Sequence, residues 1–256
     1  MIDSISLISG HPMPLLGLGT WQLRGQACKK AVQMAYELGY RHFDTAWLYQ
    51  NQQEIGEILR ELRVDRSDIF LTSKIWRDSL TASLVKSQFQ LCLDHLQMDY
   101  VDLLLIHWPS PEVPLTETLN AFMELHQQGR VKSIGVSNFD IDLIEEARAI
   151  APISVNQVEC HIGHHSPELQ AYCQQHQVAI TAYCPLAKQS ILSHPTVLSV
   201  AEQQQRTAAQ VALRWLVQKK IIVIPKASSH SHLKDNLDIF DWQLDDAQMN
   251  LLDSVN

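Results

Sequence analysis

Eight short runs of β-forming residues alternate along the chain with stretches whose apolar residues recur at helical spacing. In the stretches 81–96 and 115–128, for example, apolar residues stand at positions i, i+3, i+4 and i+7. Strands that alternate with helices form a parallel sheet, and eight such strands close into a barrel. We therefore predict an α/β fold, a (β/α)8 TIM barrel with short loops. Its strands are expected at 15–20, 41–45, 69–74, 101–107, 132–138, 154–159, 179–183 and 221–226.

The first strand region argues against the main alternative, an open doubly wound sheet. A sheet of that kind normally carries G-x-G-x-x-G after its first strand when it binds a dinucleotide, whereas residues 17–22 read GLGTWQ. Residues 4–14 alternate in polarity around a Ser-Gly pair, which predicts an N-terminal β-hairpin that plugs the bottom of the barrel. Because no linker interrupts the pattern, we predict a single domain over residues 1–256.

Composition and charge exclude several classes of partner. The chain is 46% hydrophobic and 19% charged, as ordinary globular proteins are. Its formal net charge of −8, without a basic cluster, predicts binding neither to nucleic acid nor to anionic membranes. We find no apolar run long enough to cross a membrane and no signal peptide. Five cysteines without a C-x-x-C pair are typical of a reduced, cytoplasmic protein.

Each predicted barrel strand ends in polar residues. Strands of such a barrel are buried on both faces, and their carboxyl ends surround the active site. One polar residue at a strand end is usually a turn cap, but a complete ring of them predicts a functional site. The ring consists of Thr20, Asp44, Lys74, His107, Ser137, Asn138, Gln157, Glu159, Tyr183 and Lys226.

Four residues at or near these ends have the chemistry of proton transfer. A phenol such as Tyr49 has a pKa of roughly 10, too high for easy exchange at neutral pH. We expect the ammonium of Lys74 to lower the pKa of Tyr49, and Asp44 to supply the counter-charge that a buried lysine needs. His107 offers a neutral donor that orients a carbonyl group. The group suits a tyrosine that protonates an oxygen while hydride reaches the adjacent carbon.

Eight fragments along the chain resemble the motifs of the aldo-keto reductase family. They occur in the family's order over nearly the whole length, as GLGTW, HFDTAWLYQNQQEIG, LTSKIW, LLLIHWP, SIGVSNF, VNQVE, TAYCPL and VIPK. The short loops and LIHWPSP most resemble the bacterial 2,5-diketo-D-gluconate reductase branch. The resemblance implies a catalytic tetrad with Tyr49 as the acid, and His107, where a branch that reduces C=C bonds has Glu, implies carbonyl reduction. The tetrad is Asp44, Tyr49, Lys74 and His107.

The same resemblance implies an NADP-dependent oxidoreductase. The expected reaction is reduction of small aldehydes, α-dicarbonyls such as methylglyoxal, and keto-sugars to alcohols. The alternative is a nucleotide-binding, largely non-catalytic scaffold or regulatory subunit, since the family includes such members. Residues implied to bind the cofactor are Gly19, Thr20, Trp21, Asp44, Ser137, Asn138, Gln157, Tyr183, Leu186, Lys226, Ser228, Ser229, His232, Asp235 and Asn236.

Two positions depart from the family's clamp for the adenosine 2′-phosphate. Ala227 replaces a serine, and His232 stands where the family has an arginine. An arginine is always charged and binds bidentately, whereas a histidine is a conditional cation. We therefore expect a weakened preference for NADPH, with NADH also used and the preference smaller at alkaline pH.

The substrate pocket is expected to be open. Its walls are predicted to be Trp21, Leu48, Trp76 and Trp108, with Tyr49 and His107 at the reacting centre. The chain stops at Asn256, where family members continue into a tail that folds over the substrate, so we expect a truncated C-terminal tail and broad specificity. Residues 160–165, CHIGHH, fit no zinc spacing, and we predict no metal. The resemblance implies a monomer.

Overall fold

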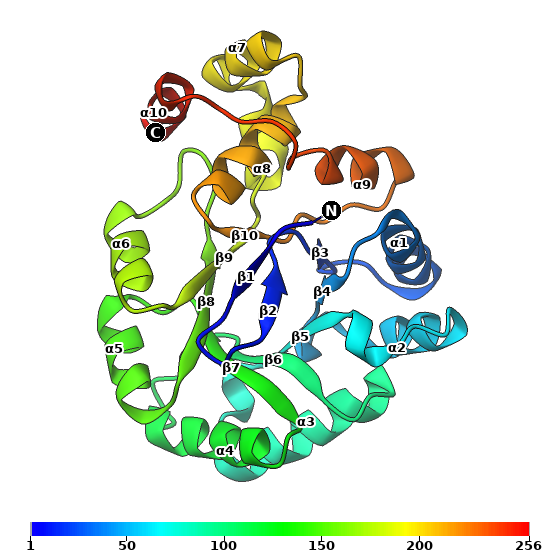
Figure 1. Ribbon diagram of the computed structural model, residues 1–256. Coiled ribbons are helices and arrows are strands. Elements are labelled where there is room, and N and C mark those ends of the chain that lie inside the picture. The colour runs from blue at the N-terminus through cyan, green and yellow to red at the C-terminus, as the bar shows by residue number, and fades with distance from the viewer. Residues whose placement is uncertain (1, 256) are drawn as a thin grey trace.

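The computed structural model describes residues 2–255 and contains a two-stranded and an eight-stranded sheet (Figure 1). All neighbouring strands of the larger sheet are parallel, in the order β10-β9-β8-β7-β6-β5-β4-β3. The predicted α/β barrel is therefore confirmed. Its strands are β3 (Leu18–Gly19), β4 (His42–Asp44), β5 (Phe70–Ile75), β6 (Val101–Ile106), β7 (Val131–Ser137), β8 (Ile153–Glu159), β9 (Ala179–Tyr183) and β10 (Ile222–Val223).

The barrel closes where its first and last strands meet. Leu16 and Val223 form a parallel bridge, and Val223 accepts a hydrogen bond from Gly17 at 2.9 Å. A Cβ atom on Gly19 would stand 2.4 Å from the carbonyl oxygen of Ile224, so a side chain there would push the seam apart. Strands β3 and β10 are each only two residues long, shorter than the strands predicted at 15–20 and 221–226. The regular strand pairing at this seam is limited to these residues.

Helices surround the barrel in Figure 1, and most of them connect successive strands. The helix α1 (Gly25–Leu38) is followed by its C-cap residue Gly39, whose φ of 105° lies in the left-handed region that glycine adopts without strain. The helices are α1 (Gly25–Leu38), α2 (Gln52–Glu61), α3 (Ala82–Leu96), α4 (Leu115–Gln127), α5 (Ile141–Ile150), α6 (Pro167–Gln175), α7 (Pro195–Gln204), α8 (Ala208–Gln218), α9 (His230–Leu237) and α10 (Asp246–Asp253). Short 3-10 helices are η1 (Trp47–Tyr49), η2 (Arg66–Asp68), η3 (Arg77–Ser79) and η4 (Ala187–Ser193).

The N-terminal hairpin covers the end of the barrel opposite the carboxyl ends of the strands. Its strands β1 (Ser4–Ser6) and β2 (Pro12–Pro14) pair antiparallel and cross the barrel in Figure 1. Met13 is fully buried, and the hydroxyls of Ser9 and Ser133 are 2.7 Å apart. Because Ser133 lies near the start of β7, the hairpin closes the bottom of the barrel, as predicted. Within residues 2–255, no helix is both long and apolar enough to span a bilayer.

Candidate active site

A cleft of about 1060 Å³ opens at the carboxyl ends of the barrel strands. The barrel topology places these ends together, so residues far apart in the sequence meet there. Ser228 and Ser229 are not part of the lining, and Lys74 lies buried beneath it. The predicted residues that line the cleft are Gly19, Thr20, Trp21, Asp44, Leu48, Tyr49, Trp76, His107, Trp108, Ser137, Asn138, Gln157, Tyr183, Leu186, Lys226, His232, Asp235 and Asn236.

Lys74 is the centre of a buried hydrogen-bonded cluster. Its side chain is fully buried on β5. An ammonium has three N–H donors, and Lys74 Nζ donates to Asp44 Oδ1, to the carbonyl oxygen of Thr45 at 3.1 Å and to the Tyr49 hydroxyl at 3.2 Å. Burial alone would lower the pKa of Lys74, but the charge of Asp44 raises it above its ordinary value. The lysine therefore stays charged, with all three donors used.

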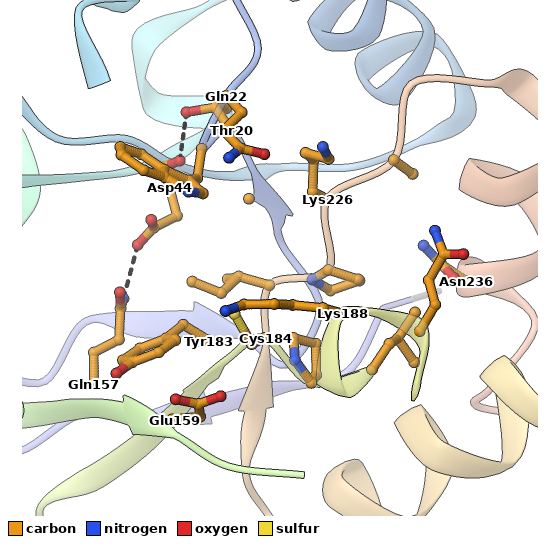
Figure 2. Close-up of a pocket in the computed structure, with 18 of the residues that line it drawn as sticks. Thr20, Gln22, Asp44, Gln157, Glu159, Tyr183, Cys184, Lys188, Lys226 and Asn236 are labelled. Carbon is orange, nitrogen blue, oxygen red and sulfur yellow. Dashed lines mark hydrogen bonds between the residues drawn. The ribbon is translucent and has the colours of Figure 1, made fainter. Parts of the chain in front are cut away.

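Asp44 links this cluster to the opposite side of the barrel. Its second carboxylate oxygen, Oδ2, accepts a hydrogen bond from Gln157 Nε2 at 2.8 Å, and Figure 2 shows the two side chains pointing toward one another. Asp44 is 1% exposed, so the pairing with Lys74 and Gln157 compensates the loss of water around a buried carboxylate.

Tyr49 extends from η1 into the cleft, above Lys74. Burial raises the pKa of Tyr49, and the charge of Lys74 only partly offsets this. The predicted interaction is present, but the prediction of a net lowered pKa is wrong because burial outweighs the neighbouring charge. Tyr49 consequently keeps its proton at neutral pH. Its ring centre lies 4.8 Å from that of Trp21 and 5.7 Å from that of His107.

His107 is neutral at physiological pH. Burial, followed by the charge of Lys74, lowers the pKa of His107 to about 3. Trp76 packs edge-on against the imidazole with ring centres 5.1 Å apart. Within residues 2–255, His107 Nδ1 is buried and has no hydrogen-bond partner. A buried N–H without an acceptor is costly, which favours the tautomer that carries its proton on Nε2.

A second polar network joins the ends of four neighbouring strands, β6 to β9, beside the tetrad. Asn138 Nδ2 donates to the carbonyl oxygen of His107 at 3.1 Å, and Asn138 Oδ1 accepts from the Tyr183 hydroxyl at 2.8 Å. Ser137 Oγ donates to the carbonyl oxygen of Gln157 at 2.7 Å. Asn138 has a φ of 63°, a left-handed conformation that asparagine tolerates better than most residues. The network holds the Tyr183 ring at the cleft wall.

Asn51 supports the site, although sequence reasoning gave it no role. It is fully buried, accepts from Thr45 Oγ1 at 2.7 Å, and donates through Nδ2 to the carbonyl oxygens of Thr20 and Leu23 at 2.8 and 3.0 Å. An asparagine directly before a helix normally indicates a cap, but its side chain does not cap α2. Asn51 instead ties together the loops that carry Thr20 and Tyr49.

The other end of the cleft is formed by residues 226–236. Lys226 and His232 are exposed, whereas Asn236 is 4% exposed. Ser229 caps α9, and its hydroxyl accepts a hydrogen bond from the backbone N–H of His232 at 3.3 Å. The predicted role of Ser228 and Ser229 at a phosphate stays a prediction.

Comparison with known proteins identifies the family. The sequence model that describes the aldo/keto reductase family matches residues 15–256 of this chain. The chain belongs to the aldo/keto reductase family. It is therefore an oxidoreductase of the nicotinamide-dependent class that the sequence motifs predicted.

Individual members of the aldo/keto reductase family are similar over nearly all of this chain. Glyoxal reductase of Bacillus subtilis is 35% identical over 257 residues, covering 99% of this chain and 93% of that protein. The structure of a putative 2,5-diketo-D-gluconic acid reductase B has a TM-score of 0.95 at 35% identity, covering 99% of this chain and 91% of that one. An aldo-keto reductase complexed with NADPH has a TM-score of 0.93 at 32% identity, covering 99% and 87%.

Several residues line the cleft of this aldo/keto reductase without having been assigned a cofactor or substrate role from the sequence. They include Gln22, Glu159, Cys184, Lys188 and Gln189, and Figure 2 labels the first four around the pocket. The loop after β9 contributes three of them. One sequence signal could have identified Lys188: it is a basic residue in the loop directly after Tyr183, which was already predicted to bind the cofactor. Within residues 2–255, no group of three metal-ligating side chains comes together.

Proposed function

We propose that this chain uses NADPH to reduce aldehydes and reactive ketones to alcohols, with Tyr49 as the general acid. The substrates proposed are small aldehydes, α-dicarbonyls such as methylglyoxal, and keto-sugars. Similarity to a glyoxal reductase and to a putative 2,5-diketo-D-gluconic acid reductase B supports these classes. The observation that carries the proposal is the hydrogen bond from the buried Lys74 ammonium to the Tyr49 hydroxyl at 3.2 Å.

The residues around the cleft fit a dinucleotide. NADPH, when bound, supplies the hydride. We assign the nicotinamide amide to Ser137, Asn138 and Gln157, and the face of its ring to Tyr183. These residues line the cleft at one end, and hydrogen bonds hold the side chains of Ser137, Asn138 and Tyr183 in place. Similarity to an aldo-keto reductase complexed with NADPH supports the same cofactor.

The exposed end of the cleft suits the adenosine half. Lys226 and His232 supply charge for the 2′-phosphate, and Asp235 and Asn236 supply polar groups for the adenine. Lys226 and His232 line the cleft and are exposed to an anion entering from solvent. Because Ala227 and His232 offer fewer fixed donors than serine and arginine, we propose that NADPH is preferred over NADH by a reduced margin.

The tetrad residues would move one proton. Tyr49 holds its proton at neutral pH because burial raises its pKa, and it transfers that proton to the carbonyl oxygen of the substrate as hydride adds to carbon. The phenolate that remains accepts a hydrogen bond from Lys74, whose charge stabilises it. Asp44 keeps Lys74 charged and in place. His107, neutral, donates from Nε2 to the same carbonyl oxygen and orients it.

Aromatic side chains would form the substrate walls. Trp21 is 46% exposed and Trp108 is 40% exposed, and both line the cleft next to Tyr49 and His107. Large apolar side chains that stand exposed at a cleft mark a binding surface more often than isolated surface residues do. We propose that Trp21, Leu48, Trp76 and Trp108 contact the organic part of the carbonyl substrate.

The expectations about domain organisation, oligomeric state, cellular location and partners also stay proposals. We propose one domain over residues 1–256, a monomer, and a cytoplasmic protein that binds neither nucleic acid nor membranes. The net charge of −8 supports the last point, because it repels anionic polymers and surfaces.

The decisive test compares the wild type with Tyr49→Phe. Oxidation of NADPH is followed by its absorbance with methylglyoxal and with an aromatic aldehyde, and NADPH binding is measured by quenching of tryptophan fluorescence. We expect kcat to fall by about 10²- to 10⁴-fold while NADPH binding is unchanged, since a positioned general acid contributes that much. A wild type that binds NADPH without turnover of any carbonyl would favour the non-catalytic scaffold instead.

A further inference from the structure

Two neighbouring loops carry residues of the proposed active site. The turn at residues 20–23 follows β3 and carries Trp21, and the loop at residues 45–51 follows β4 and carries Tyr49. The rings of Trp21 and Tyr49 have their centres 4.8 Å apart. Apart from the single turn of η1, neither loop has regular secondary structure. A loop holds a reacting group in a precise place only where side chains fix the loop itself.

The side chain of Asn51 closes the loop at residues 45–51 across its base. Thr45 and Asn51 are the first and last residues of this loop, and Thr45 Oγ1 donates to Asn51 Oδ1 at 2.7 Å. Both residues are fully buried. Lys74 Nζ donates to the carbonyl oxygen of Thr45 at 3.1 Å and to the Tyr49 hydroxyl at 3.2 Å. The bond across the base therefore constrains how far Tyr49 stands from Lys74.

The amide nitrogen of Asn51 holds the turn at residues 20–23. This turn is closed by a backbone hydrogen bond from Leu23 N to the oxygen of Thr20 at 3.0 Å. Asn51 Nδ2 donates to the carbonyl oxygens of the same two residues, at 2.8 Å to Thr20 and 3.0 Å to Leu23. Trp21 lies inside the turn that is held in this way. One buried amide thus fixes the loop of Trp21 relative to the loop of Tyr49.

The hydrogen bonds of Asn51 serve these loops rather than the helix that follows. An asparagine directly before a helix normally caps it, but the side chain of Asn51 makes no capping bond to α2. An amide has two N–H donors and one acceptor oxygen on a planar group. Asn51 uses both donors and the oxygen within the two loops. A single hydroxyl, such as that of serine, cannot serve all three partners.

We propose that Asn51 is a positioning residue of the reaction, which holds the Tyr49 hydroxyl beside Lys74 and the ring of Trp21 against Tyr49. The inference rests on the proposed function, in which Tyr49 is the general acid. Asn51 is fully buried and is not part of the cleft lining, so it acts on the substrate through other residues. Displacement of a reacting group by about 1 Å lowers a rate by about 10²-fold, so the loss is expected in kcat.

A double-mutant cycle between Asn51→Ser and Tyr49→Phe tests this role. The value of kcat is measured with methylglyoxal at saturating NADPH. We expect Asn51→Ser to lower kcat about 10- to 10²-fold when Tyr49 is present. In the Tyr49→Phe background the same substitution should change kcat by less than about twofold, because the group that Asn51 positions is gone.

The pH dependence of the reverse reaction is a second measurement, which a loss of stability alone would not change. When benzyl alcohol is oxidised with NADP⁺, Tyr49 accepts the proton, so the rate falls as the pH drops below the pKa of Tyr49. The titratable groups that face Tyr49 are Lys74, Asp44, Cys184 and His107. Among them, the charge of Lys74 lowers the pKa of Tyr49. If Asn51→Ser lets Tyr49 move away from Lys74, this pKa should rise and the fall in rate should begin at a higher pH.

A milder variant tests the same network if Asn51→Ser fails to fold. Thr45→Val removes only the bond to Asn51 Oδ1 and keeps the carbonyl oxygen that binds Lys74, so kcat should fall about three- to tenfold. Thr118→Val is the matched control, because the buried Thr118 hydroxyl donates to the carbonyl oxygen of Leu80 at 2.8 Å and neither residue lines the cleft. It should leave kcat unchanged. Unfolding in urea shows that each variant is folded under the assay conditions.

Three outcomes would overturn the role of Asn51 while leaving the proposed function intact. The first is a kcat of Asn51→Ser, or of Thr45→Val, equal to that of the wild type. The second is an equal loss with and without Tyr49, since the effect would then not pass through Tyr49. The third is a loss in Thr118→Val as large as that in Thr45→Val. A Tyr49→Phe variant with full activity would instead overturn the proposed function, and the role of Asn51 with it.

Discussion

At one end of the cleft Asp44, Lys74 and Gln157 are buried and hydrogen-bonded to one another, whereas at the other end Lys226 and His232 are exposed. Within residues 2–255, neither of the two exposed side chains makes a side-chain hydrogen bond. The buried end is thus organised before a ligand arrives, because its charges could not be buried without partners. The exposed end is organised by the ligand, since water satisfies its charges until then.

This difference has an energetic consequence. Substitutions at the buried end should change the stability of the fold together with the reaction, because each side chain there serves as a partner for another. Substitutions at the exposed end should change the choice of cofactor and leave stability alone. The variants below compare the two ends in order of decreasing expected effect.

The largest effect is expected from Asp44→Asn. The substitution leaves the fully buried ammonium of Lys74 without its counter-charge, and breaking a buried ion pair costs about 3–5 kcal/mol. We expect the free energy of unfolding to fall by that amount in urea titrations followed by tryptophan fluorescence. Asp78→Asn is the control, because Asp78 pairs with Arg77 at 3.7 Å on the exposed surface.

Asp44→Asn also separates the contribution of the cluster to stability from its contribution to catalysis. Adding Lys74→Met should recover part of the lost stability, since the uncompensated charge is then removed, but it should not recover activity. A variant Asp44→Asn as stable as Asp78→Asn would contradict the comparison between the ends, because the buried pair would then contribute no more than a surface pair.

A smaller effect is expected from acid on the buried histidines. Burial lowers the pKa of His107 to about 3 and that of His42 to about 4, below the ordinary value of 6.5. As the pH falls, the unfolded chain therefore takes up protons before the folded chain does. The stability from these groups is complete above about pH 6.5 and is lost toward the folded pKa. Each buried histidine should contribute a slope of about 1.4 kcal/mol per pH unit in this window.

Unfolding in urea between pH 7 and pH 5 measures this slope. His107→Gln should remove the contribution of one histidine to the pH dependence of the free energy of unfolding. The difference in this free energy between wild type and variant should therefore shrink as the pH falls from 6.5. His230→Gln, at the exposed start of α9, is the matched substitution on the surface. Parallel stability curves for wild type and His107→Gln would show that His107 takes up its proton at the same pH in the folded and unfolded chains.

Much of the buried end could be predicted from the sequence, for a topological reason. Parallel barrel strands bring all their carboxyl ends together, so polar residues at positions such as Asp44, Lys74 and Gln157 must share one site. The net pKa shift of Tyr49 could not be predicted, because it depends on the depth of burial rather than on which residue stands nearby. The sequence pattern gives the neighbours of a residue but not its solvent access.

Residues that act through loop geometry were harder to find. Asn51 looks like a helix cap in the sequence but bonds to the backbone of two loops, which depends on how those loops fold over one another. Lys188 reaches the cleft because three residues adopt left-handed φ values, and none of them is a glycine that would have indicated such a turn. The segments that connect the barrel strands to the long helices therefore carried the least predictable part of the site.

The smallest effect, and the sharpest test of the exposed end, is expected from His232. This histidine lines the cleft, is exposed and can be a cation only when protonated, so the ratio of kcat/KM for NADPH to that for NADH should fall as the pH rises from 6 to 9. His232→Arg should raise the ratio about two- to fivefold and remove its pH dependence, because arginine stays charged and an exposed ion pair is weak. His230→Arg, on the same helix but outside the cleft lining, should change neither the ratio nor its pH dependence.

A wild-type ratio that is constant over this pH range would exclude His232 from the 2′-phosphate. Unchanged unfolding of His232→Arg in urea, set beside the loss in Asp44→Asn, would show that the two ends of one cleft are held by different forces.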